Sequence, residues 1–367
     1  MAESAWLVLE DGRRFRGLAY GARATQVGEV VFNTCMTGHQ EVLTDPSYAG
    51  QIIVMTAAQV GNTGINGEDS ESRGIFARGF VARELSDAVS SHRATGSLDG
   101  WLRDHGIPGI HGIDTRALTR HLRDRGVMRG ALSTEGVDPD ELAARARDWP
   151  GLSGVDLAGQ VSAERAYAWP PDGPSPYHVV VYDYGVKWNI LRCLAAAPAR
   201  VTVVPARTTA SDVLALRPDA VLLSNGPGDP EPVAEYAAAE IRELLGRVPI
   251  MGICLGIQLL GLTLGGRTFK LPFGHHGGNH PVQCLATGSV AITSQNHNYC
   301  VDPDSLPDGA VQVTHINLND GTLEGFRCRS IPCFAVQYHP ESAPGPHDAR
   351  GLFQDLFRLV EEWRGAR

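Results

Sequence analysis

The second half of the chain alternates short apolar segments with amphipathic ones, and this alternation constrains the fold more than any other feature. Apolar runs typical of buried strands cover residues 178–182, 200–204, 219–223 and 250–253. Helical patterns lie between them, over residues 187–197, from about residue 211, and over residues 233–245. This alternation of strands and helices predicts an α/β fold with a doubly wound, mainly parallel sheet and right-handed crossovers. Ligands bind beyond the carboxyl ends of such strands, so the residues that follow each strand are candidates for a site.

The first half predicts a separate, mixed α/β domain. A strand over residues 6–9, an Asp11-Gly12 turn and a second strand from Phe15 open it. Asp114 and Asp138 are placed to cap two later helices. The run PPDGPSP at residues 170–176 cannot continue a helix or a central strand. We therefore expect an N-terminal domain over residues 1–150, a linker over residues 151–176, and a second domain over residues 177–367.

Composition and charge exclude several classes of function. The chain has 32 basic and 41 acidic side chains and a formal charge of −9, which favours neither nucleic acid nor an anionic membrane as a partner. Its seven cysteines show no CxxC spacing, so neither a disulfide framework nor a zinc ribbon is indicated. The cysteine pattern, together with the lack of a signal-peptide pattern at the start, favours the reducing cytoplasm as the compartment. The uncharged run over residues 248–266 contains Pro249 and glycines, which predicts a strand, a turn and a helix rather than a membrane span.

The strongest chemical signal follows the strand at residues 250–253. Gly252-Ile253-Cys254-Leu255-Gly256 has the G-x-nucleophile-x-G pattern of a sharp strand-to-helix turn, with cysteine as the nucleophile. The two glycines are needed because the tight turn brings neighbouring backbone too close for a Cβ. At the N-terminus of the following helix, the helix dipole favours the thiolate of Cys254, and the N–H of Leu255 points toward an oxyanion.

A base and an oxyanion donor follow other strands. His339 leaves a predicted strand over residues 333–338, and Glu341 lies two residues on, where a carboxylate can orient the imidazole ring. Cys254, His339 and Glu341 therefore form a candidate triad. The loop Ser224-Asn225-Gly226-Pro227-Gly228-Asp229-Pro230 follows the strand at residues 219–223, and the N–H of Gly226 is a candidate for completing an oxyanion hole.

Three motifs, SNGPGDP, GICLG and QYHPE in chain order, resemble those of class I glutamine amidotransferases. The resemblance extends over nearly the whole chain to one family, the small, glutamine-hydrolysing subunits of carbamoyl phosphate synthase. The segments that carry this wider resemblance cover residues 30–52, 106–126, 273–281, 294–299, 318–325 and 344–348.

The resemblance implies a reaction and a set of residues. Cys254 attacks the carboxamide of L-glutamine to form a γ-glutamyl thioester, His339 moves the proton, and Glu341 holds His339. The implied oxyanion donors are Gly226 and Leu255. The implied glutamine-binding residues are Ser47, Gly226, Gly228, Leu255, Gln258, Asn296, Asn298 and Tyr299.

The resemblance also implies a partner. Ammonia passes to a large subunit that makes carbamoyl phosphate from bicarbonate and ATP, for pyrimidine and arginine biosynthesis. We expect this heterodimer to use ATP and Mg²⁺ on the large subunit, with no cofactor and no metal in this chain, and the N-terminal domain to provide the docking surface. The spacing of His276 and His280 suggests metal ligation, but Gly277-Gly278 between them disfavours a helix, and the family pattern makes this segment a loop.

Two residues depart from the family pattern, and two alternative functions stay open. Ile257 stands where histidine is common, and Asn298 stands where glycine is usual, a position that asparagine tolerates if φ is positive. The first alternative is an amidotransferase that serves a different synthetase. The second is a regulatory subunit with a decayed glutaminase site, which the presence of all three triad residues disfavours.

Overall fold

The computed structural model describes residues 3–170 and 175–366, and the chain divides into two compact units. Unit 1 comprises residues 1–153 and 272–277, and unit 2 comprises residues 154–271 and 278–367. The boundary at Ser153 falls inside the interval where the sequence places a linker. The rest of that interval up to Trp169 is part of unit 2, and residues 171–174 lie outside the described residues.

Unit 1 is built on a seven-stranded closed barrel, which the sequence did not predict beyond a mixed α/β domain. Its strand order is β1-β2-β6-β5-β4-β3-β7. The strands are β1 (Ser4–Leu9), β2 (Arg14–Gly21), β3 (Thr25–Asn33), β4 (Gln51–Met55), β5 (Gly79–Val81), β6 (Pro108–His111) and β7 (Met128–Ser133). The closure joins β1 antiparallel to β7 and β3 antiparallel to β7, so strands distant in sequence become neighbours.

The helices described in unit 1 are α1 (His39–Thr44), α2 (Leu98–Asp104), α3 (Thr115–Arg125) and α4 (Pro139–Asp148), with a 3₁₀ turn at Pro46–Tyr48. Two of them, α3 and α4, begin where the sequence predicts. The side chain of Asp114 caps α3 by accepting from the N–H of Ala117, and Asp138 caps α4 by accepting from the N–H of Asp140. Both predicted capping residues are confirmed. Leu118 and Leu122 of α3 are fully buried against barrel residues.

A short segment from the second half of the sequence also packs in unit 1. The carbonyl of Pro272 accepts from the N–H of Val127 at 2.8 Å, and Phe273 stacks on Phe32 with ring centroids 5.9 Å apart. This segment lies within strand β13 (Arg267–Cys284), so the prediction of a loop there is wrong. Its glycines and histidines indicated a loop by composition, whereas β13 gains its strand conformation by pairing with β14 and β15.

Unit 2 contains a ten-stranded sheet in the order β14-β13-β15-β16-β17-β12-β11-β9-β10-β8. Its strands are β8 (Tyr167–Trp169), β9 (Tyr177–Asp183), β10 (Ala199–Pro205), β11 (Ala220–Leu223), β12 (Ile250–Ile253), β13, β14 (Val290–Asp302), β15 (Val311–Asn317), β16 (Leu323–Cys328) and β17 (Cys333–Val336). The pairs β10–β9, β9–β11, β11–β12 and β12–β17 are parallel, as the alternating pattern predicts.

The prediction of a mainly parallel sheet needs correction. Parallel pairing is confined to the centre, since β8 pairs antiparallel with β10, and β15 pairs antiparallel with β13 and β16. Short loops without helices join β15 to β16 and β16 to β17, so these strands form hairpins, and hairpins pair antiparallel. The sheet of unit 2 is therefore mixed. Its central strands are parallel, and their carboxyl ends are the ones at which the sequence predicts a site.

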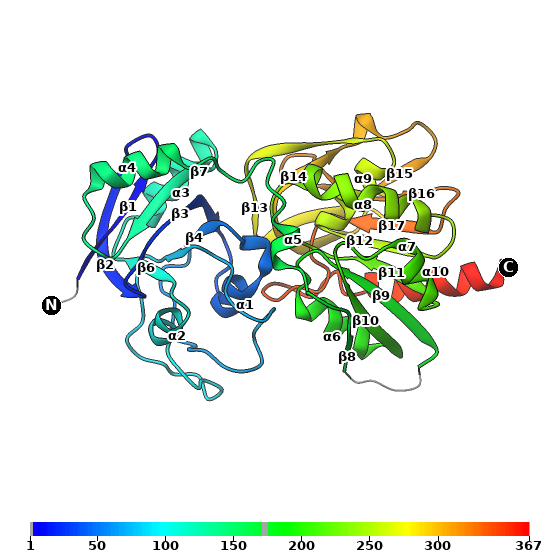
Figure 1. The fold of residues 1–367 in the computed structure, drawn as a ribbon, viewed down its shortest axis with the longest axis horizontal. Helices are drawn as coiled ribbons and strands as arrows, with labels where there is room; N and C mark the ends of the chain where they lie inside the picture. Colours follow the sequence, from blue (N-terminus) through cyan, green and yellow to red (C-terminus); the bar gives the residue numbers. More distant parts are fainter. Residues whose placement is uncertain (1–2, 171–174, 367) are drawn as a thin grey trace. The chain divides into compact units, whose positions relative to one another are not determined.

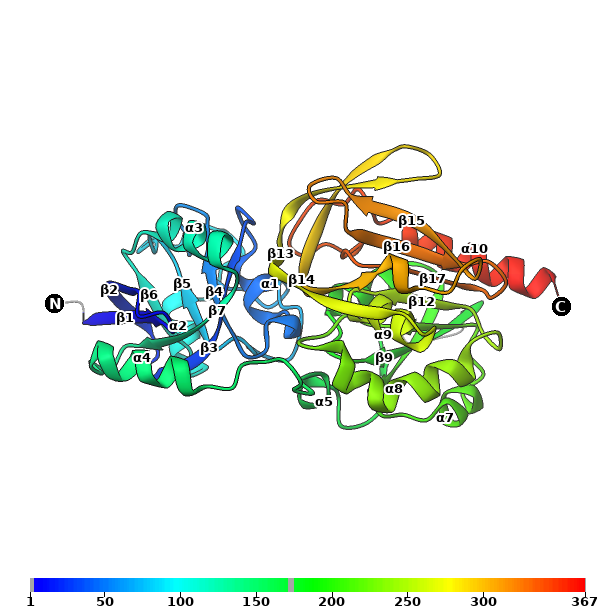
Figure 2. The same cartoon turned by 90° about the horizontal axis from the view of Figure 1, so that it is seen from above.

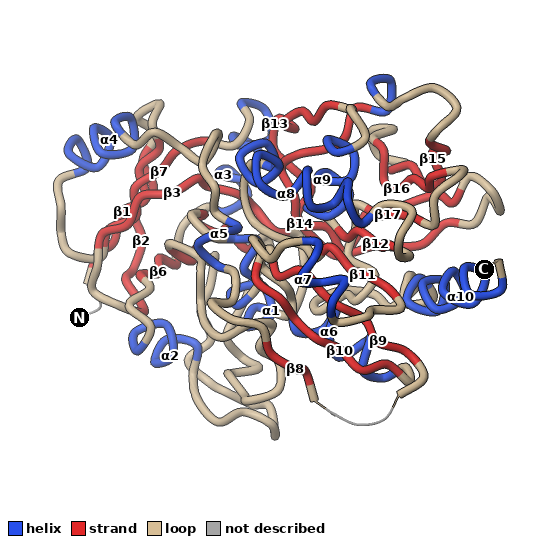
Figure 3. Tube along the Cα trace, turned by 45° about the vertical axis from the view of Figure 1, so that its right-hand side comes forward, coloured by secondary structure: helices blue, strands red, loops and turns tan. Residues whose placement is uncertain are grey.

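Helices cover both faces of the parallel strands. They are α5 (Ala158–Val161), α6 (Trp188–Ala196), α7 (Ala210–Ala215), α8 (Pro230–Leu244), α9 (Leu255–Thr263) and α10 (Leu352–Gly365). Residues of α7, α8 and α9 form one apolar core with the sheet, and residues of α6 and α10 form the other (Figures 1 and 2). Figure 3 shows α7, α8 and α9 in blue in front of the red strands.

Burial follows helical periodicity in α8 but not in α9. Val233, Ala237 and Ile241 of α8 recur at i, i+4 and i+8 and are buried on one face. In contrast, α9 is buried nearly all round. The apolar run at residues 248–266 therefore belongs to the strand–turn–helix that the sequence predicts. Among residues 3–170 and 175–366, no helix combines the length and the apolar character needed to cross a membrane.

Candidate active site

Cys254 occupies a sharp turn between β12 and α9. Its backbone has φ 55° and ψ −104°, a conformation that is strained for a residue with a side chain. A Cβ on Gly256 would lie 2.3 Å from the carbonyl oxygen of Leu223, and a Cβ on Gly252 would lie 2.8 Å from the carbonyl carbon of Gly256. Only glycine therefore fits at both flanking positions, for the reason that the sequence analysis gave. The thiol is 1% exposed, and its Sγ lies 3.5 Å from the carbonyl oxygen of Asn296.

His339 and Glu341 form a buried, hydrogen-bonded pair. Nδ1 of His339 lies 2.6 Å from Oε1 of Glu341, and both side chains are almost completely buried. The N–H of His339 donates to the carbonyl of Ser294 on β14 at 2.9 Å, which fixes the backbone that carries the ring. Nε2 has no hydrogen-bond partner among the residues that the structure describes. The imidazole is thus oriented through Nδ1, and Nε2 is left for a reacting group.

Electrostatics keep this pair ionised at neutral pH. Burial alone would lower the pKa of His339, but the charges of Glu341 and Cys254 outweigh it and raise the pKa to about 10. Burial would likewise raise the pKa of Glu341, but Lys187, and then His339, lower it to about 2. An imidazole with a raised pKa, close to a thiol and held by a carboxylate, can accept the thiol proton and return it to a leaving group.

Lys187 is a site residue that the sequence analysis missed. It follows β9 and precedes α6, is 2% exposed, and its Nζ lies 2.9 Å from the same Oε1 of Glu341 that His339 contacts. Nζ also donates to the carbonyl of Ser342. Lys187 is one of only two lysines in the chain. It follows the carboxyl end of a predicted strand, and this position could have indicated from the sequence that Lys187 belongs to the site.

We expect Lys187→Met to destabilise the protein, because the variant leaves the Glu341 carboxylate buried without its cation. Removing one member of a buried ion pair typically costs about 3–5 kcal/mol. The folded-state pKa of Glu341, about 2, lies below its ordinary 4.5, so the stability it contributes is present above 4.5 and is lost as the pH falls toward 2. The difference in free energy of unfolding between wild type and variant should therefore narrow over that acid range.

Urea unfolding at several pH values measures this difference. Lys270→Met is the matched control, since it removes the other lysine at an exposed position. A stability difference for Lys187→Met that stays constant from neutral pH down to the acid range would show that the Lys187–Glu341 ion pair is not its source.

The two residues that the sequence suggests as oxyanion donors, Gly226 and Leu255, lie close to each other at the start of α9. Leu255 is the first residue of α9, so its N–H has no partner within the helix. A Cβ on Gly226 would lie 2.7 Å from the side chain of Leu255 and 2.3 Å from the carbonyl oxygen of Tyr184. The loop after β11 therefore approaches the start of α9 closely, and glycine at residue 226 makes that approach possible.

The predicted glutamine-binding residues of unit 2 lie along α9, β14 and the loop after β11. Nε2 of Gln258 donates to the carbonyl of Tyr299 at 2.8 Å, and the hydroxyl of Tyr299 donates to Oδ2 of Asp229 at 3.2 Å. These hydrogen bonds connect the three elements. Asn296 is buried beside Cys254, and Gly228 has φ 81°. The structure thus brings Cys254, His339, Glu341, Gly226, Leu255, Gln258, Asn296 and Tyr299 to one end of the parallel strands.

Both departures from the family pattern have a structural explanation. Ile257 is fully buried in the apolar core between α9 and the sheet, where an isoleucine packs without a polar partner. Asn298 lies within β14 and is not among the described residues with positive φ, so its backbone does not require glycine. Ser47, in contrast to the other candidates, belongs to unit 1, where it is buried in the 3₁₀ turn after α1.

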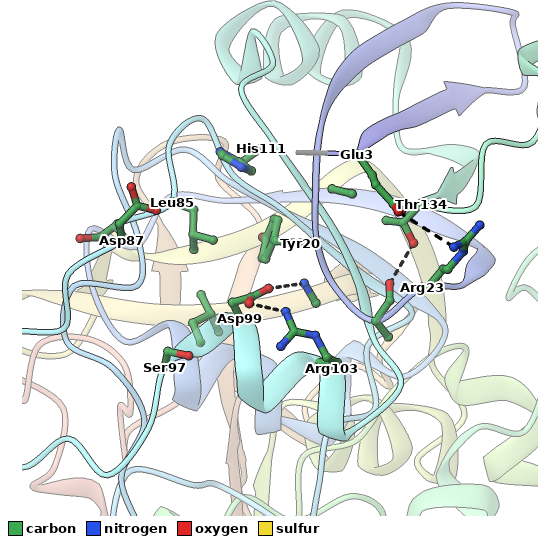
Figure 4. A pocket seen from close by; sticks show the side chains of 15 residues that line it. Glu3, Tyr20, Arg23, Leu85, Asp87, Ser97, Asp99, Arg103, His111 and Thr134 are labelled. Atoms are coloured by element: carbon green, nitrogen blue, oxygen red, sulfur yellow. Dashed lines mark hydrogen bonds and ion pairs between the residues drawn. The ribbon is translucent and has the colours of Figure 1, made fainter. Parts of the chain in front are cut away.

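Unit 1 contains a separate polar cavity of about 440 Å³. Asp99 accepts from the N–H of Gly21 at 2.7 Å and pairs with Arg103 at 2.5 Å, and Arg23 lies 4.0 Å from Glu3 (Figure 4). None of the sequence-predicted site residues lines this cavity. Four of its charged groups form ion pairs with one another, Arg103 with Asp99 and Arg23 with Glu3.

The comparisons with known proteins agree with this site. Residues 180–359 match the family model "Glutamine amidotransferase class-I", so the fold and site define a class I glutamine amidotransferase. Residues 7–132 match "Carbamoyl-phosphate synthase small chain, CPSase domain". The chain belongs to the carbamoyl phosphate synthase small chain family, and it is an enzyme, the glutaminase component of a glutamine-hydrolysing carbamoyl phosphate synthase.

Similar proteins from three organisms support that membership. All three are named carbamoyl phosphate synthase small chain. The protein from Syntrophotalea carbinolica is 53% identical over 98% of this chain and 98% of the relative. The Aquifex aeolicus protein is 49% identical over 98% of this chain and 100% of the relative. The Vibrio cholerae protein is 50% identical over 99% of this chain and 100% of the relative. The family resemblance stated from the motifs is therefore confirmed.

Proposed function

We propose that Cys254 hydrolyses L-glutamine through a γ-glutamyl thioester and that the ammonia serves a large subunit that makes carbamoyl phosphate. One observation carries the proposal: a cysteine on a strained strand-to-helix turn stands beside a histidine that a buried carboxylate orients. Neither a structural cysteine nor a surface histidine requires this combination. Because all three groups are buried and connected, the arrangement also disfavours a decayed site.

The reaction begins with the proton of the Cys254 thiol already on Nε2 of His339, because the raised pKa of His339 keeps the ring protonated at neutral pH. The sulfur then attacks the amide carbon, the imidazolium returns the proton to nitrogen, and ammonia leaves. Water attacks the resulting thioester in the second half of the reaction and releases glutamate. Glu341 stays ionised throughout, since Lys187 and His339 both favour its carboxylate form, and it holds His339 by Nδ1.

The N–H groups of Gly226 and Leu255 stabilise the oxyanion of the tetrahedral intermediate. We expect Gly226→Ala to lower kcat by about 10²–10³-fold, the loss found when one oxyanion donor is removed. The physical reason is that the new Cβ would lie 2.3 Å from the carbonyl oxygen of Tyr184 and must displace the loop. Steady-state glutamate release measures the effect.

Gly351→Ala is the control for that prediction, because a Cβ at residue 351 meets nothing within 4 Å. Both variants should show the circular dichroism spectrum of the wild type. If Gly226→Ala kept the wild-type kcat, the loop after β11 would not supply an oxyanion donor.

The resemblance to the family implies a set of glutamine-binding residues, and these residues belong to the proposal. We propose that Gly228, Gln258, Asn296 and the backbone of Asn298 and Tyr299 contact glutamine from unit 2, and that Ser47 contacts it from unit 1. Ser47→Ala should then raise the KM for glutamine by about tenfold, the effect of losing roughly one hydrogen bond of 1.4 kcal/mol, and leave kcat nearly unchanged. Ser153→Ala, at the edge of unit 1, is the comparison variant. An unchanged KM would remove Ser47 from the proposed binding site.

The partner, the pathways and the compartment follow from the proposed function. The large subunit binds ATP and Mg²⁺ and consumes bicarbonate and ammonia, and this chain supplies no cofactor. We propose that unit 1 docks the partner in a heterodimer that serves pyrimidine and arginine biosynthesis. The seven cysteines are all free thiols, which supports the reducing cytoplasm as the compartment.

A tagged chain purified gently from its own cells tests the assignment of the partner. We expect a large ATP-using subunit to copurify, and the complex to make carbamoyl phosphate from glutamine, bicarbonate and ATP. Copurification of a different synthetase would retain the glutaminase chemistry and overturn the proposed product. Docking should also raise the glutaminase kcat, because an uncoupled site would waste glutamine.

A further inference from the structure

Two cysteines that play no part in the glutaminase reaction face each other on the hairpin of β16 and β17. The register pairs Gly325 with Val336, Phe326 with Ala335, and Arg327 with Phe334. The next pair in this register is Cys328 and Cys333, the last residue of β16 and the first of β17. Directly opposed residues of antiparallel strands have Cα atoms about 4.5–5.5 Å apart, inside the range of about 4.4–6.8 Å that a disulfide spans.

The two thiols interact in the reduced protein. Both cysteines are free, and their side chains share a hydrogen bond. This bond lowers the pKa of the Cys328 thiol and raises that of Cys333. Because the two residues oppose each other at the end of the hairpin, Cys333 is placed to resolve an oxidised Cys328.

An oxidant has a path to this pair. Cys328 and Cys333 both line a cavity of about 650 Å³ beside α10, although they are only 6% and 3% exposed. The loop that joins the two strands, residues 329–332, is exposed or half-buried, so the end of the hairpin is not enclosed by other elements. A small oxidant can enter the cavity, whereas a protein thiol of another chain is excluded by the burial of both sulfurs.

We propose that Cys328 and Cys333 form a reversible disulfide within the β16–β17 hairpin when the protein meets hydrogen peroxide. The Cys328 thiolate attacks one peroxide oxygen, the O–O bond breaks, and the released hydroxide takes up a proton to leave as water. The Cys333 sulfur then attacks the sulfenic acid, the S–S bond forms, and the second oxygen leaves as water with the Cys333 proton. Two thiols are oxidised and one peroxide is reduced to two waters.

The test uses peptide mapping of the full chain. A Cys254→Ala background removes the proposed nucleophile, so the result does not depend on the proposed glutaminase function. The reduced protein is treated with hydrogen peroxide, denatured, alkylated and cut with trypsin, which cleaves after Arg327, Arg329 and Arg350. We expect peptides 328–329 and 330–350 to be joined, with loss of two hydrogens, and to separate on addition of dithiothreitol.

Matched variants complete the design. Cys328→Ser and Cys333→Ser should each abolish the joined peptides, and Cys284→Ser should retain them, although Cys284 lines the same cavity. If a serine variant fails to fold, the map of the parent chain still decides the question. Full alkylation of both thiols after peroxide, a cross-link to Cys284, or oxidation of Cys328 to sulfinic acid without a cross-link would each overturn the proposal.

Discussion

Replacing Cys254 by alanine should abolish glutamine-dependent activity and spare ammonia-dependent activity. Glutamate release should fall by about 10⁴-fold or more, as when the nucleophile of a comparable triad is removed. The reason is that the sulfur forms the covalent intermediate, and no other described thiol occupies a strand-to-helix turn with the backbone angles of Cys254. Glutamate release is measured on the chain alone and in complex with its large subunit.

The complex supplies the control for this prediction. With ammonium in place of glutamine, the Cys254→Ala complex should make carbamoyl phosphate at the wild-type rate, because the large subunit then receives its nitrogen directly. Cys193→Ala, a thiol on α6 outside the site, should retain both activities. Retention of glutamine-dependent synthesis by Cys254→Ala would exclude the thioester route.

His339→Asn should lower the glutaminase kcat by about 10²–10⁴-fold, the usual contribution of a positioned acid–base group. Because the pKa of His339 is raised from its ordinary 6.5 to about 10, the ring stays protonated through neutral pH. The wild-type rate should therefore fall as the pH rises through about 10, when the imidazolium that protonates the departing ammonia is lost. The variant should lack this alkaline limb.

A pH–rate profile of both proteins measures this effect. His347→Asn is the control, since His347 is exposed in the loop that follows Glu341. The change at His347 should leave the rate and the profile unchanged. An alkaline limb that persists in His339→Asn would assign that ionisation to another group.

The sequence predicted the parallel core and its strand ends because that information is local. Apolar runs such as residues 219–223 and 250–253 are short and bounded by turn residues, and both became strands of unit 2. The GxCxG pattern likewise depends only on neighbouring residues, since the glycines are needed within the turn itself. The capping aspartates of α3 and α4 were predictable for the same reason.

The remaining features depend on contacts between distant residues. The barrel of unit 1 closes by pairing β1 with β7, and no local pattern indicates that pairing. Strand β13 contains glycines and histidines that favour a loop when read alone, and its pairing partners override that preference. Lys187 becomes significant only because the fold brings it to Glu341, 154 residues away in sequence.

Covalent labelling of Cys254 tests the central claim most directly. A glutamine analogue that carries an electrophilic diazoketone is incubated with the full chain, and the tryptic peptide of residues 248–267, in which Cys254 is the only cysteine, is analysed by mass spectrometry. We predict one adduct on Cys254, inactivation in proportion to labelling, and protection by glutamine. Labelling of a different cysteine, or full labelling without loss of glutaminase activity, would contradict the account.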